Sequence, residues 1–176
     1  SISKKFSYEY FDGDRKYGYG GYINDGRWKE VAKKIINYYS LKENSKILDV
    51  GCAKGFLVNE FNLLRMDAYG IDISEYALSK AEGEFKNKLS ICNAKKINFP
   101  DNFFDLVISF NTIHNLAYKD CLLSIKEIIR TSKKNKFIQV DAYENDREKE
   151  EFLKWVLTAE THGTPKFWLD LFKKTN

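Results

Sequence analysis

Residues 47–55 read Ile47-Leu48-Asp49-Val50-Gly51-Cys52-Ala53-Lys54-Gly55, a short apolar run followed at once by closely spaced small residues. The apolar run has the length of a buried β-strand. The small residues at 51, 53 and 55 let the backbone turn sharply and come close to a ligand. A helix that begins after this turn points its N-terminus toward the same place. The stretch therefore predicts a strand–turn–helix unit with a ligand site at the turn.

Strands and helices alternate on both sides of this unit. Continuous apolar strands between amphipathic helices are typical of a parallel sheet that is covered on both faces. We therefore expect an α/β domain with a Rossmann-like, doubly wound, mostly parallel sheet and helices on both faces. The expected strands are 46–50, 68–71, 89–92, 104–109 and 136–140, and the expected helices are 27–39, 56–65, 74–83, 118–131, 144–160 and 165–172.

The first 26 residues differ from the rest of the chain. They lack apolar periodicity and are rich in tyrosine and glycine, as in the run from Tyr17 to Tyr22. Disordered segments are usually poor in aromatic residues. We therefore expect residues 1–26 to form an arm or lid that folds over the domain of residues 27–176, with a disordered tail as the alternative.

Composition and charge bear on several functional classes. The chain has 176 residues, enough for one domain without disulfides or a structural metal. Its formal net charge of +4 comes mainly from lysines spread along the sequence, whereas a nucleic-acid binder usually concentrates them on one stripe. No apolar run approaches the roughly 20 residues that span a bilayer, and the N-terminus carries no signal segment. We expect a cytoplasmic protein that binds neither nucleic acid nor membrane. Its three scattered cysteines, Cys52, Cys92 and Cys121, predict no metal site.

Three features bear on the ligand of the turn. A dinucleotide-binding turn requires a small residue at the position of Phe56, which is too large for close packing there. Asp49 precedes the glycines, and Asp72 ends the second strand. A carboxylate at the position of Asp72 can accept hydrogen bonds from both hydroxyls of a ribose, and Ile73 can cover one face of an adenine. The turn is therefore a poor match for a nicotinamide-dependent oxidoreductase.

These residues resemble the motifs of class I methyltransferases that use S-adenosylmethionine (SAM). Residues 47–55 are similar to their motif I, hydrophobic-Asp/Glu-x-Gly-x-Gly-x-Gly. Residues 70–74 are similar to their ribose-binding strand end, and residues 93–109 to the stretch that enters their fourth strand. The resemblance covers about residues 45–141 and is greatest to the type 11 methyltransferase-domain group. It implies SAM as cofactor and S-adenosylhomocysteine (SAH) as product.

The resemblance also implies roles for the matched positions. Five would surround the methionine part of SAM: Asp49, Gly51, Cys52, Ala53 and Gly55. Four would hold the adenosine: Asp72 at the ribose, Ile73 on the adenine face, and Asn93 and Ala94 at the adenine edge. Outside the motifs, Tyr19 can close over the cofactor with the rest of the arm. Arg27 is a candidate partner for the SAM carboxylate, because motif I supplies no charged donor.

The sequence departs from the family pattern at three places. Ala53 replaces the middle glycine, a mild change as long as its φ stays negative. Asn93 stands where Asp is common, so we expect a weaker acceptor for adenine N6 and a lower SAM affinity. The antiparallel strand pair that usually ends this fold is missing, which would leave an apolar edge at 136–140. Either the chain continues, or another element or the second subunit of a homodimer covers this edge.

His114 and Asn111 are the candidate catalytic residues, because they follow the fourth strand where it faces the junction between SAM and acceptor. His114 could act as a general base, and the alternative is a loop histidine with a structural hydrogen bond. Methyl transfer depends mainly on holding nucleophile, carbon and sulfur in line, so activity does not require an obvious base.

We therefore expect a SAM-dependent methyltransferase that acts on a small-molecule acceptor by in-line transfer. An RNA or protein methyltransferase is one alternative. A SAM-binding protein without turnover is another, and Asn93 and the missing strand pair would fit it.

Overall fold

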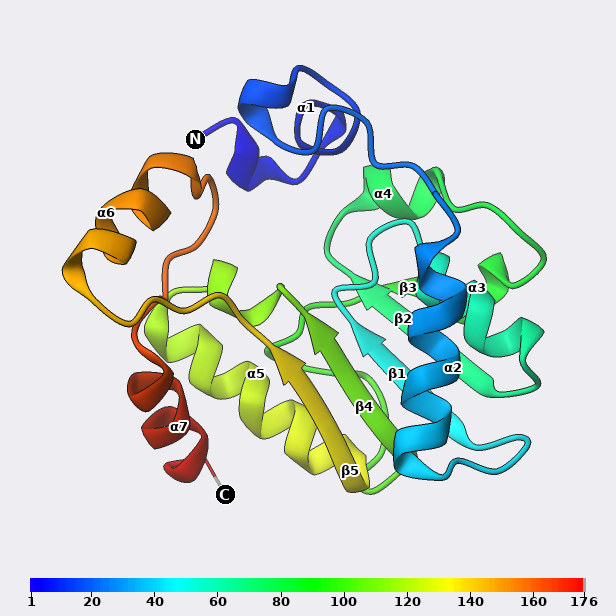
Figure 1. Ribbon diagram of the computed structural model, residues 1–176. Coiled ribbons are helices and arrows are strands. Elements are labelled where there is room, and N and C mark those ends of the chain that lie inside the picture. The colour runs from blue at the N-terminus through cyan, green and yellow to red at the C-terminus, as the bar shows by residue number, and fades with distance from the viewer. Residues whose placement is uncertain (176) are drawn as a thin grey trace.

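The computed structural model describes residues 1–175, which form one parallel sheet surrounded by helices (Figure 1). The strand order is β3-β2-β1-β4-β5, and every neighbouring pair is parallel. The chain therefore winds in opposite directions on the two sides of β1, which makes the boundary between β1 and β4 the switch point where such sheets bind ligands. The strands are β1 (Lys46–Val50), β2 (Asp67–Asp72), β3 (Leu89–Ile91), β4 (Phe104–Phe110) and β5 (Ser132–Gln139).

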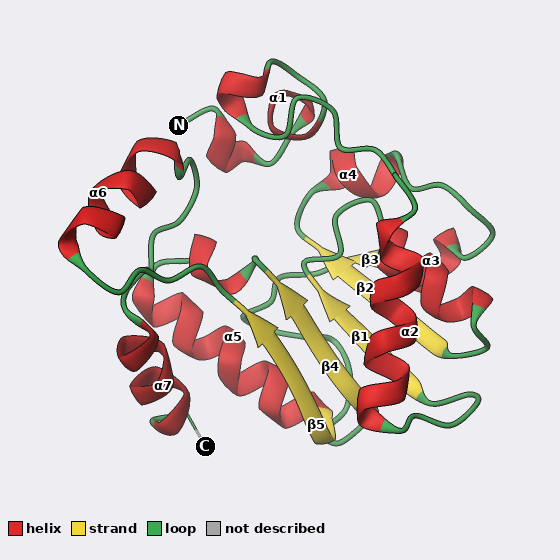
Figure 2. Ribbon diagram, viewed as in Figure 1, coloured by secondary structure: helices red, strands yellow, loops and turns green. Residues whose placement is uncertain are grey.

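Helices cover both faces of the sheet, as the sequence predicts (Figure 2). The α-helices are α1 (Tyr8–Phe11), α2 (Arg27–Tyr39), α3 (Phe56–Leu63), α4 (Glu75–Ser79), α5 (Tyr118–Thr131), α6 (Asp146–Trp155) and α7 (Pro165–Lys173). The 3-10 helices are η1 (Ser3–Lys5), η2 (Arg15–Tyr17), η3 (Lys86–Lys88) and η4 (Ile113–Asn115). No helix among residues 1–175 has both the length and the apolar character needed to cross a membrane.

Neighbouring residues of β1 point to opposite faces and so join two separate apolar cores. Ile47 packs with Phe61 of α3 in the core that also contains α2. Leu48 packs with Ile125 of α5 in the core that also contains α7. All four side chains are fully buried or nearly so. The continuous apolar character of β1 in the sequence is the consequence of this burial on both faces.

Three predicted helices end earlier than expected, among them the helix predicted over 56–65, which ends at Leu63, and the last strand begins earlier. The helix predicted over 144–160 ends at Trp155, because the residues beyond it bond to η4 instead of continuing the helix. Thr158 donates to the side chain of Asn115 at 2.7 Å, and the backbone N–H of Thr161 donates to His114 at 3.0 Å. α4 ends at Ser79, before the predicted limit, and α5 runs directly into β5 at residue 132.

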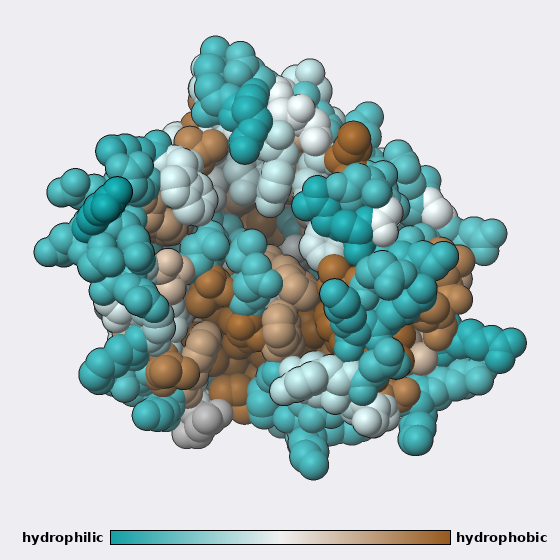
Figure 3. Space-filling view, in the orientation of Figure 1, coloured by the Kyte–Doolittle hydropathy of each residue, from teal (hydrophilic) through white to brown (hydrophobic). Residues whose placement is uncertain are grey.

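β5 forms one edge of the sheet. Within residues 1–175 it pairs only with β4, and no antiparallel strand pair follows it. Phe137 and Ile138 are half-buried, while Lys136 and Gln139 are exposed. Figure 3 shows apolar side chains gathered on the face of the molecule where this strand lies. The open edge expected from the sequence is therefore present, and its coverage by further chain or a second subunit stays a prediction.

The arm of residues 1–26 lies across the carboxyl ends of the strands (Figure 1). It contains η1, α1 and η2, and its two halves are joined by backbone hydrogen bonds. The N–H of Tyr19 donates to Tyr10 at 2.8 Å, and the N–H of Gly21 donates to Phe11 at 3.0 Å. The arm thus adopts a folded conformation above the end of the sheet where a ligand is expected.

Candidate functional site

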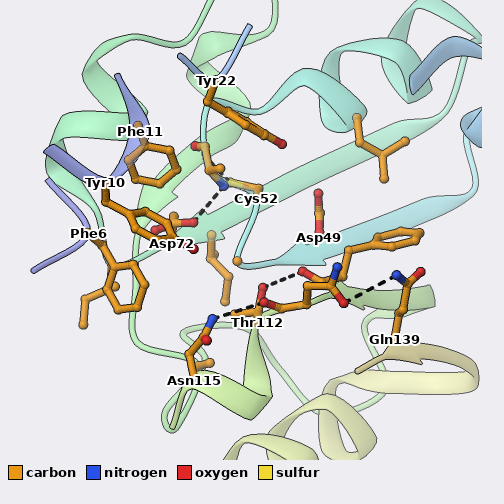
Figure 4. A pocket seen from close by; sticks show the side chains of 18 of the residues that line it. Phe6, Tyr10, Phe11, Tyr22, Asp49, Cys52, Asp72, Thr112, Asn115 and Gln139 are labelled. Carbon is orange, nitrogen blue, oxygen red and sulfur yellow. Dashed lines mark hydrogen bonds between the residues drawn. The ribbon is translucent and has the colours of Figure 1, made fainter. Parts of the chain in front are cut away.

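A cavity of about 450 Å³ lies between the arm and the carboxyl ends of β1, β2 and β4 (Figures 3 and 4). Its volume falls in the range of small-molecule sites. All the site residues predicted from the sequence line this cavity except Gly55 and His114. The switch point of the sheet therefore carries the expected cluster of residues.

No residue with a side chain fits at the position of Gly51. Its φ is 84°, and a Cβ atom there would lie 2.1 Å from Oγ1 of Thr112. Gly55 has a different role, since it caps the N-terminus of α3 with a φ of 74°. A Cβ atom on Gly55 would lie 2.5 Å from Leu89, so this glycine permits close packing between the turn and β3. The two glycines keep the turn short and close to the sheet.

Ala53 does not meet the condition under which its replacement of glycine would be mild. Its φ is 49°, in the left-handed region, which costs an L-amino acid with a side chain about 1–2 kcal/mol. The backbone N–H of Ala53 donates a hydrogen bond to Oδ2 of Asp72 at 2.7 Å. This hydrogen bond requires the loop to turn at Ala53. Alanine therefore adopts a left-handed backbone conformation that glycine would adopt without strain.

Asp72 joins the turn to the end of β2. Its Oδ2 accepts from Ala53, and its Oδ1 accepts from the N–H of Ser74 at 2.8 Å, which leaves further lone pairs facing the cavity (Figure 4). Burial raises the pKa of Asp72, and the hydrogen bonds from Ser74 and Ala53 oppose that rise. Such a carboxylate, fixed by two backbone donors, can accept the paired hydroxyls of a ribose.

Asp49 lies at the end of β1 and is buried. Burial raises the pKa of its carboxyl to about 7, and the negative charge of Asp72 contributes to the rise. The ionised form of Asp49 is thus disfavoured, and a positively charged ligand group would restore it. This end of the cavity therefore suits a cation.

Ile73, Asn93 and Ala94 line the end of the cavity next to Asp72. Ile73 is 58% exposed, so its side chain is free to cover a ring. Oδ1 of Asn93 accepts a hydrogen bond from the N–H of Lys95 at 3.0 Å and retains a second lone pair. These positions are compatible with the adenine contacts that the resemblance implies.

Aromatic residues of the arm form the opposite wall. Phe6, Tyr10, Phe11 and Tyr22 line the cavity with Tyr19, and in Figure 4 the first three stand together on the side opposite Asp49. Burial raises the pKa of Tyr19 and of Tyr22, so both hydroxyls stay protonated at neutral pH. Sequence reasoning named Tyr19 as a site residue and Tyr22 as a further ring of the lid, but it did not select Phe6, Tyr10 or Phe11. The density of aromatic residues in the arm was the signal that could have found the others.

Arg27 lines the cavity, but its guanidinium is paired with a neighbour. Its Nε is 2.7 Å from Oδ2 of Asp25, and the side chain is 71% exposed. Holding the SAM carboxylate would require the guanidinium to share or exchange this partner. The role assigned to Arg27 stays a prediction.

Three carboxamide side chains line the cavity at the carboxyl ends of β4 and β5: Asn111, Asn115 and Gln139. Figure 4 labels Asn115 and Gln139. Asn111 has a φ of 49°, and its backbone oxygen accepts from Nδ2 of Asn115 at 3.1 Å. Trp28 and Phe110 add an apolar wall beside them. Asn115 and Gln139 were missed in the sequence, although polar residues near the carboxyl end of every parallel strand could have been considered.

His114 lies behind the cavity wall and does not line it. Its ring is buried, and Nδ1 accepts a hydrogen bond from the N–H of Asp141 at 3.4 Å. Burial lowers the pKa of His114, while the charge of Asp141 opposes this shift. The geometry favours the structural alternative, and a catalytic role for His114 stays a prediction. Among residues 1–175, His, Cys, Asp and Glu form no group that could hold a metal ion.

Comparison with known proteins identifies the family. Residues 41–173 match the model of a methyltransferase domain. The chain belongs to the methyltransferase-domain family. Its five-stranded parallel sheet has the fold of class I SAM-dependent methyltransferases, so the resemblance found in the sequence is confirmed.

Named relatives of this methyltransferase domain include phosphoethanolamine N-methyltransferases. The chain is 31% identical over 111 residues to phosphoethanolamine N-methyltransferase 3 of Arabidopsis thaliana, across 58% of this chain and 22% of that protein. It is 32% identical over 120 residues to the enzyme of Plasmodium falciparum, across 64% and 42%. Phosphoethanolamine N-methyltransferase 2 of Haemonchus contortus, solved with SAM, superposes with a TM-score of 0.71 at 17% identity, covering 100% of this chain and 44% of that one. The chain thus spans less than half the length of these three proteins.

The cavity of this methyltransferase domain fits SAM, the cofactor of its family. Gly51, Cys52 and Ala53 of the turn line the cavity, so their backbone can approach a ligand closely. Asp72 would offer fixed acceptors to the ribose, and Asp49 would offer a carboxylate to a positive group. When bound, SAM supplies a methyl group activated by a positively charged sulfur.

Proposed function

We propose that this methyltransferase domain transfers a methyl group from SAM to a small-molecule acceptor. The observation that carries the proposal is the position of the arm over the cavity, where Phe6, Tyr10 and Phe11 form part of the wall. An RNA or protein acceptor would have to displace this arm to reach the carboxyl ends of the strands. A small molecule needs only enough motion to enter.

In this proposal, the residues of the chain hold the two reactants in line. Asp72 binds the ribose and Asn93 the adenine edge, while the turn at Gly51 surrounds the methionine part. The ionised carboxylate of Asp49 faces the positive groups of the cofactor. Orientation of this kind can supply roughly 7–11 kcal/mol of the reaction barrier. The chain therefore needs no metal and no strong base for the transfer itself.

The acceptor would lie beside Asn111, Asn115 and Gln139, where β4 and β5 end. Carboxamides both donate and accept hydrogen bonds, so they can orient an amine or a hydroxyl without being ionised. The names of several relatives, which are phosphoethanolamine N-methyltransferases, favour a small amine. Arg27 is the only cation that lines the cavity within residues 1–175, and its predicted partner remains the SAM carboxylate.

The arm would act as a lid that excludes water during the transfer. Arg15 and Lys16 are exposed trypsin sites within it. If the arm is a lid, saturating SAH should slow cleavage at these sites, and deletion of residues 1–22 should weaken SAM binding and abolish turnover while the core stays folded. Equal cleavage rates with and without SAH would contradict this role.

SAH release in the presence of separate acceptor pools tests the function directly. The purified chain is incubated with SAM and a pool of small amines that includes ethanolamine and phosphoethanolamine, with total RNA, or with unfolded protein. We expect SAH above background only with the small-molecule pool, and we expect Asp72→Ala to lose it. Release with RNA or protein alone would overturn the choice of acceptor. SAM binding without release in any pool would favour a binding protein without turnover.

A further inference from the structure

Asp12 is the charged residue that ties the middle of the arm to the core, and the backbone oxygen of Phe6 adds a second tie by accepting from the hydroxyl of Ser74 at 2.5 Å. Asp12 lies between α1 and η2, and both of its carboxylate oxygens are 2.7 Å from Nζ of Lys54. Its Oδ2 also accepts from the hydroxyl of Tyr76 at 2.7 Å, and its Oδ1 accepts from the backbone N–H of Tyr22 at 3.1 Å. One carboxylate thus connects the arm with two separate elements of the core.

Those two elements are the turn of motif I and the helix that follows the ribose-binding motif. Lys54 is part of the turn between Ala53 and Gly55, yet it does not line the cavity, and its side chain extends to the arm instead. Tyr76 is the second residue of α4, which begins three residues after Asp72. The arm is therefore attached both to the turn and to the helix that follows the ribose-binding strand.

The Lys54 ammonium depends on the arm for its counter-charge. Its side chain is 9% exposed, and Asp12 is its one hydrogen-bonded partner among residues 1–175. A buried ammonium that loses its partner is strongly destabilised. If the arm lifts, the Lys54 ammonium therefore loses its partner and must be hydrated instead, and the residue that undergoes this change belongs to the turn.

The ionisation states of Asp12 and Tyr76 favour the closed position of the arm at neutral pH. Burial alone would raise the pKa of Asp12, but hydrogen bonds from Lys54, Tyr76 and Tyr22 outweigh it and hold this pKa below its ordinary value. Burial and the hydrogen bond to Asp12 raise the pKa of Tyr76 to about 12, so its hydroxyl remains a donor. Asp12 is thus charged while the Tyr76 hydroxyl keeps its proton.

The connection between the arm and α2 allows the motion. Gly26 has a φ of 84° and caps the start of α2, and a Cβ atom built on it would meet no neighbour within 4 Å. At its N-terminal side, the arm is attached by an exposed ion pair, Lys4 with Glu160 at 2.7 Å. Exposed pairs of this kind contribute little to stability, so Asp12 is the stronger of the two ionic attachments.

We propose that the cluster of Asp12, Lys54 and Tyr76 couples closure of the arm to the conformation of the cofactor turn. The cluster thereby sets the rate at which cofactor and product leave the cavity. Lys54 and Tyr76 are positioning residues, since neither lines the cavity and both act through the arm. This inference rests on the proposed function, because it takes the cavity to be the SAM site.

The dissociation rate of SAH tests the coupling. SAH is displaced by excess SAM in a stopped-flow instrument, and tryptophan fluorescence reports the exchange because Trp28 lines the cavity. Asp12→Asn should speed dissociation about tenfold or more, since truncating one partner of a buried charge pair acts mainly on the off-rate. In the Asp12→Asn background, Lys54→Met should add little, because the pair acts as a unit.

Two further variants separate coupling from general damage. Tyr76→Phe keeps the ring that packs on Phe11 and removes only the hydroxyl, so it should fold and speed dissociation about threefold. Lys4→Met removes the exposed ion pair with Glu160 and is the matched control, with an expected change below about twofold. Trypsin cleavage at Arg15 without ligand should quicken in Asp12→Asn and stay unchanged in Lys4→Met.

The outcomes of these experiments distinguish a failure of the coupling from a failure of the proposed SAM-dependent function. If wild-type protein binds no SAH, the proposed function fails and the coupling fails with it. If wild-type protein binds SAH and the Asp12→Asn and Tyr76→Phe variants release it at the wild-type rate, only the coupling is wrong. A lower melting temperature with an unchanged release rate would mean that the cluster is merely a structural tie, which also overturns the coupling.

Discussion

Asp72→Ala removes the carboxylate that holds the N–H groups of Ala53 and Ser74 while it faces the cavity. A hydrogen bond to a charged group contributes about 1.5–3 kcal/mol, and two ribose hydroxyls would each donate one. The variant also removes a carboxylate whose burial is unfavourable, and water can enter in its place. The loss is therefore smaller than the sum of the two hydrogen bonds from the ribose hydroxyls. We expect a net loss of about 1.5–3 kcal/mol, which is a roughly 10-fold to 150-fold weaker binding of SAM.

Isothermal titration calorimetry with SAM and SAH measures this loss. Glu75→Ala is the matched control, because Glu75 is an exposed carboxylate at the start of α4, three residues from Asp72 and outside the cavity. Circular dichroism melts of both variants establish that each is folded. An Asp72→Ala protein that is folded and binds SAM with wild-type affinity would refute the ribose assignment and the reasoning from its geometry.

Three other changes test separate parts of the site. SAM affinity should rise with pH by up to about tenfold per unit below pH 7 and level off above it. The reason is that the positive cofactor binds ionised Asp49, whose pKa is raised by burial to about 7. A flat calorimetric profile for the wild type, or the same slope in Asp49→Asn, would contradict this. Ala53→Gly should raise the free energy of unfolding by about 0.5–1 kcal/mol, because it relieves the left-handed φ but adds backbone freedom to the unfolded chain; urea denaturation should detect it, and a decrease would count against the strain. If His114 is a general base, His114→Ala should lower turnover without changing SAM affinity, whereas a full-rate variant removes it from the catalytic residues.

The fold could be predicted because its determinants are local in the sequence. The apolar run at 47–50, the small residues after it and the helical periodicity of 118–131 each report on neighbours within a few positions. The same holds for Asp49 and Asp72, which end adjacent parallel strands and therefore had to meet at one edge of the sheet.

The parts that could not be predicted depend on distant contacts. Lys54 looks like an unremarkable loop residue until the arm, 42 positions earlier, brings Asp12 to it. The positive φ of Ala53 follows from a bond to a residue 19 positions later. His114 seemed well placed for catalysis because it follows β4, but its ring turns toward Asp141 on the far side of the cavity wall. Periodicity carries no information about contacts of this kind.

The cavity as a SAM site is tested by calorimetric titration of the wild-type chain with SAM, SAH and NAD. This measurement depends on no acceptor and on no variant. We expect one molecule of SAM or SAH to bind per chain, with a free energy of about −7 to −8 kcal/mol and a dissociation constant in the micromolar range. We expect no measurable heat from NAD, because Phe56 occupies the position where a dinucleotide site requires a small residue. Binding of NAD in preference to SAM, or no binding of SAM at millimolar concentration to folded protein, would contradict the assignment of the cavity as a SAM site.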